Sequence, residues 1–548
     1  MILKNKTIVA VLFLIATIPS CTVDRISETT LSDPSFWSTE AELRLAANFF
    51  YTKLPSVVAF TDNWSDDACG LASNTISDGW RLVPSTDGGY NGNYSTIRAV
   101  NNFLEKAPKA LTKGVTAERV NWYVGEAKYF RAWAYFQLLQ RYGGVPLILK
   151  TLGVDAPELQ AAQASREEVL NAIYADLDDA VLMLRTARVL GAANYGRVSK
   201  TAALTLKAQV GLFEGTRSKY HNYGDPIKHL TIAKDASAEV MLSAEHTLWP
   251  NYFQLLQYEG EGFANKENIL VKQYGSAAVE VLPHNSPRVI EGGASNPTKA
   301  LADSYLMLNG LPITNSLSEY VEPKRTMSPQ PIQSSIFVNR DPRMAARFHK
   351  AGDLYKSTSV FISPPLNTCK TGFSNRCYSN PLDWFSLKCY IDHPITRYAE
   401  VLLINAEAIF ELNGSITDGE LNATINLLRT RASASMAKLT NAFVTTNGLS
   451  MRDEIRRERR VELALEGFRY WDLIRWKTAE IELPKPILGS FYYSDFTPRT
   501  NLTPINENGY LKVFTVIRKF DPARDYLFPF PTIELGLNQQ LKQNPGWQ

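Results

Sequence analysis

Apolar residues recur at helical spacing through the first half of the chain. Between residues 120 and 142, steps of four, three, four and four residues join Tyr123, Ala127, Phe130, Ala134 and Leu138. This spacing keeps the five side chains on one face of a helix. The Gly-Gly-Val-Pro segment at 143–146 predicts the end of that helix.

The same spacing predicts further helices over 40–51, 166–186 and 199–214. Small residues on these helices would let neighbouring helices approach closely, among them Ala132, Ala134, Ala202 and Ala203. Paired helices with small contact residues indicate a solenoid of helix hairpins, as in tetratricopeptide repeats. A 34-residue repeat is not legible, so any repeats are degenerate.

The second half of the chain has a different pattern. Residues 244–395 lose helical periodicity and are richer in Gly, Pro, Asn and Ser, and the apolar run at 268–271 predicts a strand. Helices are expected again at 396–413, 418–432 and 450–478, before a Pro-rich, extended tail from Ile481 onward. A low-complexity linker is missing, which predicts one compact body.

Composition narrows the class of protein. The 548 residues are 45% hydrophobic and 21% charged, which excludes a disordered, collagen-like or polytopic membrane protein. The 58 Lys and Arg residues nearly balance 55 Asp and Glu, and a net charge of +3 does not indicate a nucleic-acid partner.

The N-terminus has the layout of a secretory signal. Lys4 and Lys6 precede an apolar run over 8–19, which is too short to span a bilayer. Ser20 and then Cys21 follow, as in a bacterial lipoprotein signal. We therefore expect residues 1–20 to be removed, Cys21 to be acylated, and 21–35 to form a lipid-anchored tether. The alternative is a plain signal peptide that is cut nearby, with Cys21 incidental.

Four cysteines lie further along the chain, at 69, 369, 377 and 389. Cys369 and Cys377 are the ends of a nine-residue segment, CKTGFSNRC, that a disulfide would close into a loop in an exporting compartment. Reduced, inert thiols are the equal alternative. The spacing matches neither a zinc ribbon nor a zinc finger.

Blocks along almost the whole chain resemble the SusD/RagB family of outer-membrane lipoproteins from Bacteroidetes. The most regular blocks are GEAKYFRAWAYFQLLQRYGGVPLIL (125–149), ITRYAEVLLINAEAIFELNG (395–414), RERRVELALEGFRYWDLIRW (457–476) and QNPGW (543–547). Their order and spacing are more specific than any one block. The resemblance divides the chain into an N-terminal SusD-like helical region (36–243) and a C-terminal RagB/SusD region (244–548).

The resemblance implies a mainly α fold. Helix pairs similar to tetratricopeptide repeats would pack against an irregular, loop-rich C-terminal part with minor β structure. Family members lie on the cell surface as the lid of a SusC-like TonB-dependent transporter, to which they deliver a captured oligosaccharide. In the RagB branch the cargo is a peptide. Neither catalysis nor a cofactor is implied.

A glycan site needs aromatic rings for the apolar faces of sugars, and carboxylates, amides or guanidinium groups for the hydroxyls. Such groups are expected on loops held by a rigid scaffold. Residues 62–94 join two helices and combine aromatic with polar side chains. The predicted ligand-binding residues are Trp80, Tyr90, Trp64, Arg81, Asn91 and Asp67 from this segment, with Tyr274 from the second half. Tyr94 is expected to pack at the start of the next helix.

Charged residues on the apolar helices have two interpretations. Glu126, Arg131, Arg141, Arg397 and Glu407 suit catalysis, but buried ion pairs that fix helix register are the better account. The arginine-rich run at 456–460 interleaves with glutamates and predicts a solvated, ion-paired face.

Enzyme signatures such as HExxH, G-x-S-x-G and Walker A are missing from the sequence. Asp66 and Asp67 are adjacent, and neighbouring carboxylates rarely face the same glycosidic bond. We therefore expect a non-catalytic glycan-binding lipoprotein without an obligatory metal. Two alternatives stay open: the same role with a peptide cargo, and a scaffold that binds only protein.

Overall fold

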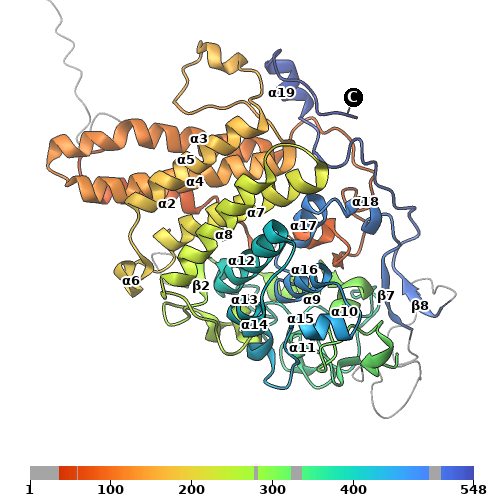
Figure 1. Cartoon of the computed structure of the whole chain (residues 1–548). Coiled ribbons are helices and arrows are strands. Elements are labelled where there is room, and N and C mark those ends of the chain that lie inside the picture. The colour runs from red at the N-terminus through yellow and green to blue at the C-terminus, as the bar shows by residue number, and fades with distance from the viewer. Residues whose placement is uncertain (1–35, 58–59, 277–281, 323–335, 493–507, 548) are drawn as a thin grey trace, which may run out of the picture.

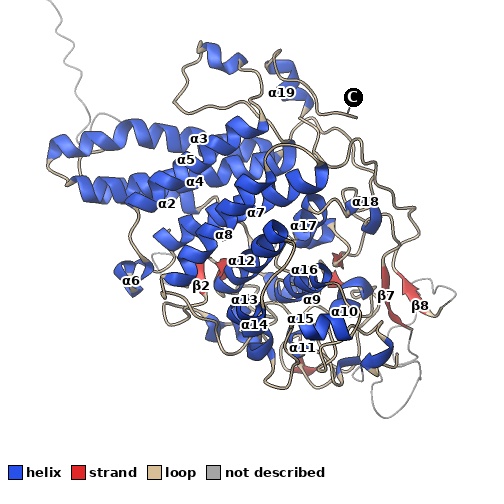
Figure 2. Ribbon diagram, in the orientation of Figure 1, coloured by secondary structure: helices blue, strands red, loops and turns tan. Residues whose placement is uncertain are grey.

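The computed structural model describes residues 36–57, 60–276, 282–322, 336–492 and 508–547. Over these residues the chain is mainly helical, with small antiparallel sheets of two strands, which confirms the expected fold class (Figures 1 and 2). The predicted signal peptide, the tether and Cys21 lie outside the described residues.

The N-terminal helices are α2 (Glu40–Tyr51), α3 (Gly88–Lys106), α4 (Ala117–Tyr142), α5 (Arg166–Met183), α6 (Ala187–Leu190), α7 (Lys200–His221) and α8 (Pro226–Leu242). Those of the second half are α9 (Ser286–Glu291), α10 (Lys299–Ser304), α11 (Pro342–Arg347), α12 (Tyr398–Asn413), α13 (Asp418–Ala423), α14 (Ile425–Ala432), α15 (Asn441–Thr446), α16 (Met451–Glu462), α17 (Arg469–Arg475), α18 (Ala479–Glu482) and α19 (Thr532–Leu537).

The strands pair between distant segments of the chain. The pairs are β1 (Ala68–Cys69) with β3 (Asn296–Pro297), β2 (Asn268–Lys272) with β6 (His393–Arg397), β4 (Leu354–Tyr355) with β5 (Ser359–Val360), and β7 (Leu488–Phe491) with β8 (Tyr510–Lys512). β2 confirms the strand predicted at 268–271. β1 and β3 attach the loop after α2 to the C-terminal half.

Successive long helices pack side by side. α3 packs on α4, α4 on α5, α5 on α7, α7 on α8, and α8 on α12 of the C-terminal half (Figure 1). This arrangement of neighbours in chain order is the helix-hairpin solenoid that the sequence predicts. A capping box at Thr39 and Glu42 fixes the start of α2.

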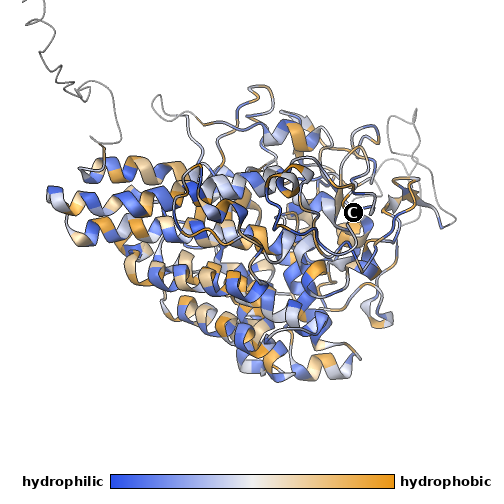
Figure 3. Ribbon diagram, turned by 90° about the horizontal axis from the view of Figure 1, so that it is seen from above, coloured by the Kyte–Doolittle hydropathy of each residue, from blue (hydrophilic) through white to orange (hydrophobic). Residues whose placement is uncertain are grey.

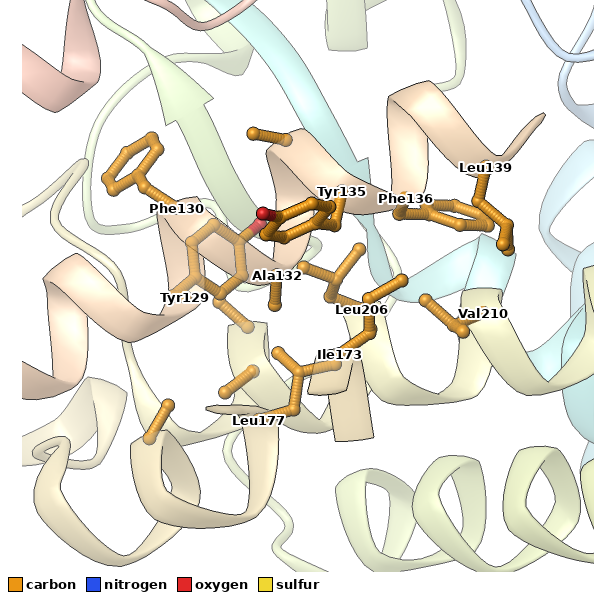
Figure 4. Packing of buried hydrophobic residues seen from close by; sticks show 14 of the residues in the cluster. Tyr129, Phe130, Ala132, Tyr135, Phe136, Leu139, Ile173, Leu177, Leu206 and Val210 are labelled. Atoms are coloured by element: carbon orange, nitrogen blue, oxygen red, sulfur yellow. The ribbon is translucent and has the colours of Figure 1, made fainter. Parts of the chain in front are cut away.

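α4 is the centre of the main core. All five residues of its predicted apolar face are buried, but so are Trp122, Tyr129 and Tyr135 on other faces. Figure 4 shows aromatic side chains of α4 packed over Ile173 and Leu177. α4 therefore has neighbours on several sides, because its sequence is apolar nearly all round.

The closest helix contact lies between α7 and α8. A Cβ atom at Gly211 would stand 2.8 Å from the backbone N of Ala233 and from the carbonyl O of His229. Glycine thus allows the two backbones to touch at this position. The predicted small residues, including Ala202 and Ala203, are also buried, but Gly211 and Gly215 mark the approach of α7 to α8.

Two stretches of the C-terminal half that were predicted as single helices are each divided into two, so these predictions are wrong. The stretch 450–478 divides into α16 and α17, because Leu465 between them adopts a left-handed conformation with φ of +64°. The stretch 418–432 divides into α13 and α14 at Thr424, whose φ and ψ are −132° and −94°. Charge and apolar patterns do not reveal such turns.

The predicted ion pairs are confirmed. Glu126 binds Arg197, Arg131 binds Asp176, and Glu407 binds Arg475, all in the buried interior. Arg397 contacts Glu267 at 2.5 Å and also reaches Glu462 and Glu466, while Arg141 lies 3.8 Å from Asp87.

The solvated face predicted around 456–460 is wrong. Glu458, Arg459 and Glu462 are buried, because α16 packs against α10, α11, α12 and α14 rather than against solvent. The predicted ion pairing is confirmed, but it lies inside the protein, where Glu458 binds Arg429 and Arg459 binds Asp472.

Figure 3 shows hydrophobic and hydrophilic residues interleaved along the helices, as expected of elements with one buried face and one exposed face. Within the described ranges, no helix has both the length and the apolar content needed to cross a membrane. Cys69, Cys369, Cys377 and Cys389 are all buried and free, so the structure shows the reduced alternative rather than the loop disulfide.

Candidate functional site

The loop after α2 divides into a buried part and an exposed part. Asp66 and Asp67 are buried beneath it and pair with Arg460, and Asp66 also binds Arg469 at 2.8 Å. Burial alone would raise the pKa of Asp66, but Arg460 and Arg469 outweigh it and hold that pKa well below its usual range. The predicted ligand contact at Asp67 is therefore wrong: its carboxylate anchors the loop.

Two predicted aromatic contacts are likewise part of the scaffold. Trp64 packs edge-on against Tyr470 at 5.7 Å between ring centroids, and tilted against Phe528 at 6.0 Å. Tyr90 is buried inside α3, beside Tyr94 and Tyr142. Helix α3 begins earlier than expected, because Asp87 caps it and draws Tyr90 into the core.

Arg81 and Tyr274 pack against other side chains, whereas Asn91 is exposed. The Arg81 guanidinium lies 4.0 Å from the Phe528 ring centroid and forms part of the packing around Trp547. Tyr274 packs against His284 in a separate cluster of the second half. Asn91 is exposed on α3, and no described contact joins it to Trp80.

Trp80 matches the prediction of an exposed aromatic ring. Half of the side chain is exposed, at 50%. Its indole Nε1–H donates to the carbonyl O of Ile517 at 2.9 Å, and the Lys519 ammonium lies 3.5 Å from the ring centroid. One edge and one face of the indole are thus held in place, while the rest of the ring faces solvent.

The backbone beneath Trp80 is also fixed. The Lys519 N–H donates to the carbonyl O of Asp78 at 3.1 Å, so segments 78–80 and 517–519 lie against each other. Gly79 has φ of +77°, and a Cβ atom there would stand 2.1 Å from the carbonyl O of Lys519. Only glycine fits this crossing.

The two chain segments that meet at Trp80 carry other exposed apolar side chains. We define the Trp80 surface as Leu71, Trp80, Leu82, Phe514, Ile517 and Lys519; Phe514 is partly buried and the other five are exposed. Lys370 is bound to the same surface, since its Nζ donates to the carbonyl O of Leu71 at 2.6 Å and lies 5.8 Å from the Phe514 ring. A platform of rings beside ammonium groups can stack on a flat apolar ligand face and donate hydrogen bonds to its edge.

The sequence pattern did not predict that residues 513–519 form part of the Trp80 surface. Residues 513–519 read VFTVIRK, in which aromatic, apolar and basic residues mix, but neither helical nor strict strand periodicity marks them. Their position beside Trp80 depends on contacts across 437 residues of chain.

Two larger hollows lie within the scaffold. One, of about 260 Å³, is lined by residues of α4, α7, α12 and α17 and includes Trp133, Gln137 and Trp471. The other, of about 400 Å³, lies beside α6. The charged groups Asp472, Arg459 and Arg475 in the first hollow pair with one another, which is typical of a structural interior. Within the described residues, no group of three His, Cys, Asp or Glu side chains is arranged to hold a metal ion.

Models of known protein families match two parts of the chain. The model of the SusD family matches residues 266–547, more than half of the chain. The chain belongs to the SusD family. A second family model, described as starch-binding and associating with the outer membrane, matches residues 58–212, which include Trp80.

Individual SusD-family relatives cover most of the chain. SusD-like protein P38 of Formosa agariphila is 24% identical over 499 residues, which are 84% of this chain and 88% of the relative. A SusD-like protein of Bacteroides ovatus is 25% identical over 72% of this chain and 66% of its own length.

Solved structures agree on the fold. A SusD-like carbohydrate-binding protein from Bacteroides fragilis superposes with a TM-score of 0.76 at 24% identity, and covers 92% of this chain and 100% of its own. A structure solved with a xylogluco-oligosaccharide superposes with a TM-score of 0.64 at 20% identity, covering 90% and 95%. The helix-pair scaffold is therefore shared with these proteins.

Proposed function

We propose that this protein is a non-catalytic, surface-exposed lipoprotein of the outer membrane that binds oligo- or polysaccharide and delivers it to a SusC-like TonB-dependent transporter. Family membership supports this role, as does the carbohydrate-binding name of the Bacteroides fragilis structure. Cys21 is the proposed site of lipid attachment.

The single observation that carries the proposal is the fixed and half-exposed indole of Trp80. An aromatic ring that is already immobilised loses little conformational entropy when a sugar stacks on it. The hydrogen bond to Ile517 and the ammonium of Lys519 provide that immobilisation.

The carboxylates near this surface favour binding over hydrolysis. A glycosidase needs two carboxyl groups that face the scissile bond. Asp66 and Asp67 are buried and bound by arginines, and Asp525 is buried and bound by Arg524. Binding without cleavage predicts that a retained polysaccharide keeps its viscosity and gains no reducing ends.

The experiment that tests the proposal is a binding screen of the protein lacking residues 1–21. Affinity electrophoresis against plant, fungal and host polysaccharides is run beside calorimetry with peptide digests. Trp80→Ala should weaken binding of the retained polysaccharide by about 1–3 kcal/mol, roughly five- to a hundredfold.

Phe49→Ala is the matched control, because Phe49 is an exposed ring of α2 that also carries a lysine, Lys53, at 4.6 Å. Equal binding by wild type and Trp80→Ala would remove Trp80 from the site. Heat with peptides and none with polysaccharides would assign a peptide cargo. Copurification with the transporter while neither ligand class binds would indicate a protein-only scaffold.

A further inference from the structure

Arg518 is a buried cation that forms no salt bridge with a described residue, although the carboxylates of Asp78 and Asp66 lie close enough to raise its pKa. Its side chain is 8% exposed, and it lies between Ile517 and Lys519 of the Trp80 surface. Nε donates to the carbonyl O of Leu483 at 2.7 Å and Nη1 donates to Ser77 Oγ at 3.0 Å. Nη2 has no hydrogen-bond partner among the described residues. Burial lowers the pKa of Arg518, but an arginine remains charged in proteins.

Other buried arginines are stabilised by carboxylates or by aromatic rings. Arg343 and Arg397 each contact two or more carboxylates. Arg217 and Arg340 have no carboxylate partner in the described ranges, but their guanidinium groups lie 5.7 Å and 5.1 Å from tyrosine rings. Arg518 has neither kind of partner among the described residues, although an unpaired buried charge is costly.

The Arg518 side chain lines a small polar cavity. The cavity measures about 70 Å³ and is lined by Arg518, Phe514 and the polar side chains of Asn63, Ser73 and Asn74. A water molecule needs about 10–15 Å³ of such space, so the cavity has room for a carboxylate or a sulfate group.

Unpaired cations continue from this cavity onto the Trp80 surface. Lys519 and Lys370 lie at the rings of Trp80 and Phe514, and neither forms a salt bridge within the described residues. On the same segment, Asp525 is bound to Arg524, and the exposed Asp521 forms no salt bridge with either lysine among the described residues. Rings beside free cations match a ligand that is both a sugar and an anion.

We propose that the Trp80 surface selects acidic polysaccharides, with the anionic substituent of one sugar bound by Arg518 in its cavity and a neighbouring ring stacked on Trp80. The substituent is a uronate carboxylate or a sulfate ester, which share the planar or tetrahedral oxygens that a guanidinium binds. This inference rests on the proposed glycan-binding function and names its substrate class.

The test compares each acidic polymer with its neutral form by affinity electrophoresis. One pair is polygalacturonate with its methyl ester, and the other is a sulfated galactan with its desulfated form. We expect at least tenfold stronger retardation by the acidic member of one pair, which identifies carboxylate or sulfate. Added salt should weaken that retardation, because a partly exposed ion pair is screened.

Variants assign the effect to the cavity. Arg518→Lys should lose at least tenfold of the affinity for the acidic polymer while retaining whatever binding the neutral polymer shows. Lys519→Met should lose several-fold. Lys53→Met, at the equivalent ring pair of α2, should change nothing. If Arg518→Lys does not fold, as its melting curve would show, the exposed Lys519→Met variant carries the test.

The outcomes separate the two proposals. Equal retardation by acidic and neutral forms would overturn the acidic specificity and leave glycan binding intact. An unchanged acidic preference in both Arg518→Lys and Lys519→Met would also overturn it. Absence of retardation by every polymer, acidic or neutral, would contradict the proposed function itself and the inference with it.

Discussion

The N-terminal helices and the surroundings of α16 bury charged side chains to different extents. Helices α4, α5 and α7 meet mainly through aromatic and aliphatic residues such as Tyr129, Ile173 and Leu206, with separate ion pairs such as that of Arg131 with Asp176. Around α16, the interior instead holds arginines and glutamates. Arg343, Arg397 and Arg431 all contact the carboxylate of Glu462. Apolar burial depends on area and shape, whereas the buried charges depend on every partner being present.

Removal of one buried charge should have the largest effect. Glu462→Gln leaves three buried arginines without their shared carboxylate. We expect a loss of about 3–5 kcal/mol in the free energy of unfolding. Urea unfolding followed by circular dichroism measures this, and a loss below about 1 kcal/mol would show that the network is not cooperative.

The stabilisation that the Glu462 network provides should be lost in acid. Burial would raise the pKa of Glu462, but the guanidinium groups of Arg431, Arg397 and Arg343 outweigh it and lower the pKa to about 2. A lowered pKa in the folded state stabilises the protein above the unfolded value of about 4.5, and this stabilisation is lost as the pH falls from there towards 2. Wild type should therefore lose more stability between pH 5 and pH 3 than Glu462→Gln, when both are compared by urea titration.

A cavity in the apolar core should cost somewhat less and should not depend on pH. Ile173 is fully buried between α4 and α7, and Ile173→Ala should lose about 3 kcal/mol. The same loss at pH 7 and pH 4 would support the contrast between the two regions. A loss that grows on acidification would mean that the N-terminal core is coupled to the charges.

A change at the crossing beneath Trp80 should affect the site more than the fold. Gly79→Ala combines a positive φ with a contact against the Lys519 carbonyl, and should cost about 1–3 kcal/mol of stability. Because the crossing holds the indole, binding of the retained polysaccharide should also weaken several-fold in affinity electrophoresis. Stability lost with full binding would show that the platform tolerates a shifted backbone.

Loss of an exposed ion pair should have the smallest effect on the free energy of unfolding. Glu118 is largely solvent-exposed and lies 3.1 Å from Arg185. Glu118→Gln should change the free energy of unfolding by less than about 1 kcal/mol, because solvent and salt screen such pairs. A larger loss in thermal melts would show that exposed ion pairs also contribute to stability, as the buried network does.

The contrast also explains what the sequence could predict. Helical spacing located α2, α4, α5 and α7, because apolar periodicity directly reports packing between helices. It did not locate the turn at Leu465 or the burial of Glu458, since charged residues on a helix are normally exposed. Residues with this pattern become internal only when distant partners surround them.

The candidate site shows the same limit. Composition identified the loop at 62–94, and within it Trp80 is exposed as predicted. Tyr90 and Trp64 pack into the core instead, because an aromatic residue in a loop segment has no periodic signal for its direction. Phe514, Arg518 and Lys519 join the surface through contacts that local patterns cannot express.

The hydrogen bond between Trp80 and Ile517 spans 437 residues of sequence, with consequences for the order of folding. Contacts between distant segments form late, because the intervening chain must first be closed into a loop. The helix pairs can assemble from local contacts while the Trp80 surface still lacks one of its two sides. We therefore expect ligand binding to be acquired at the final step of folding, after the scaffold is complete.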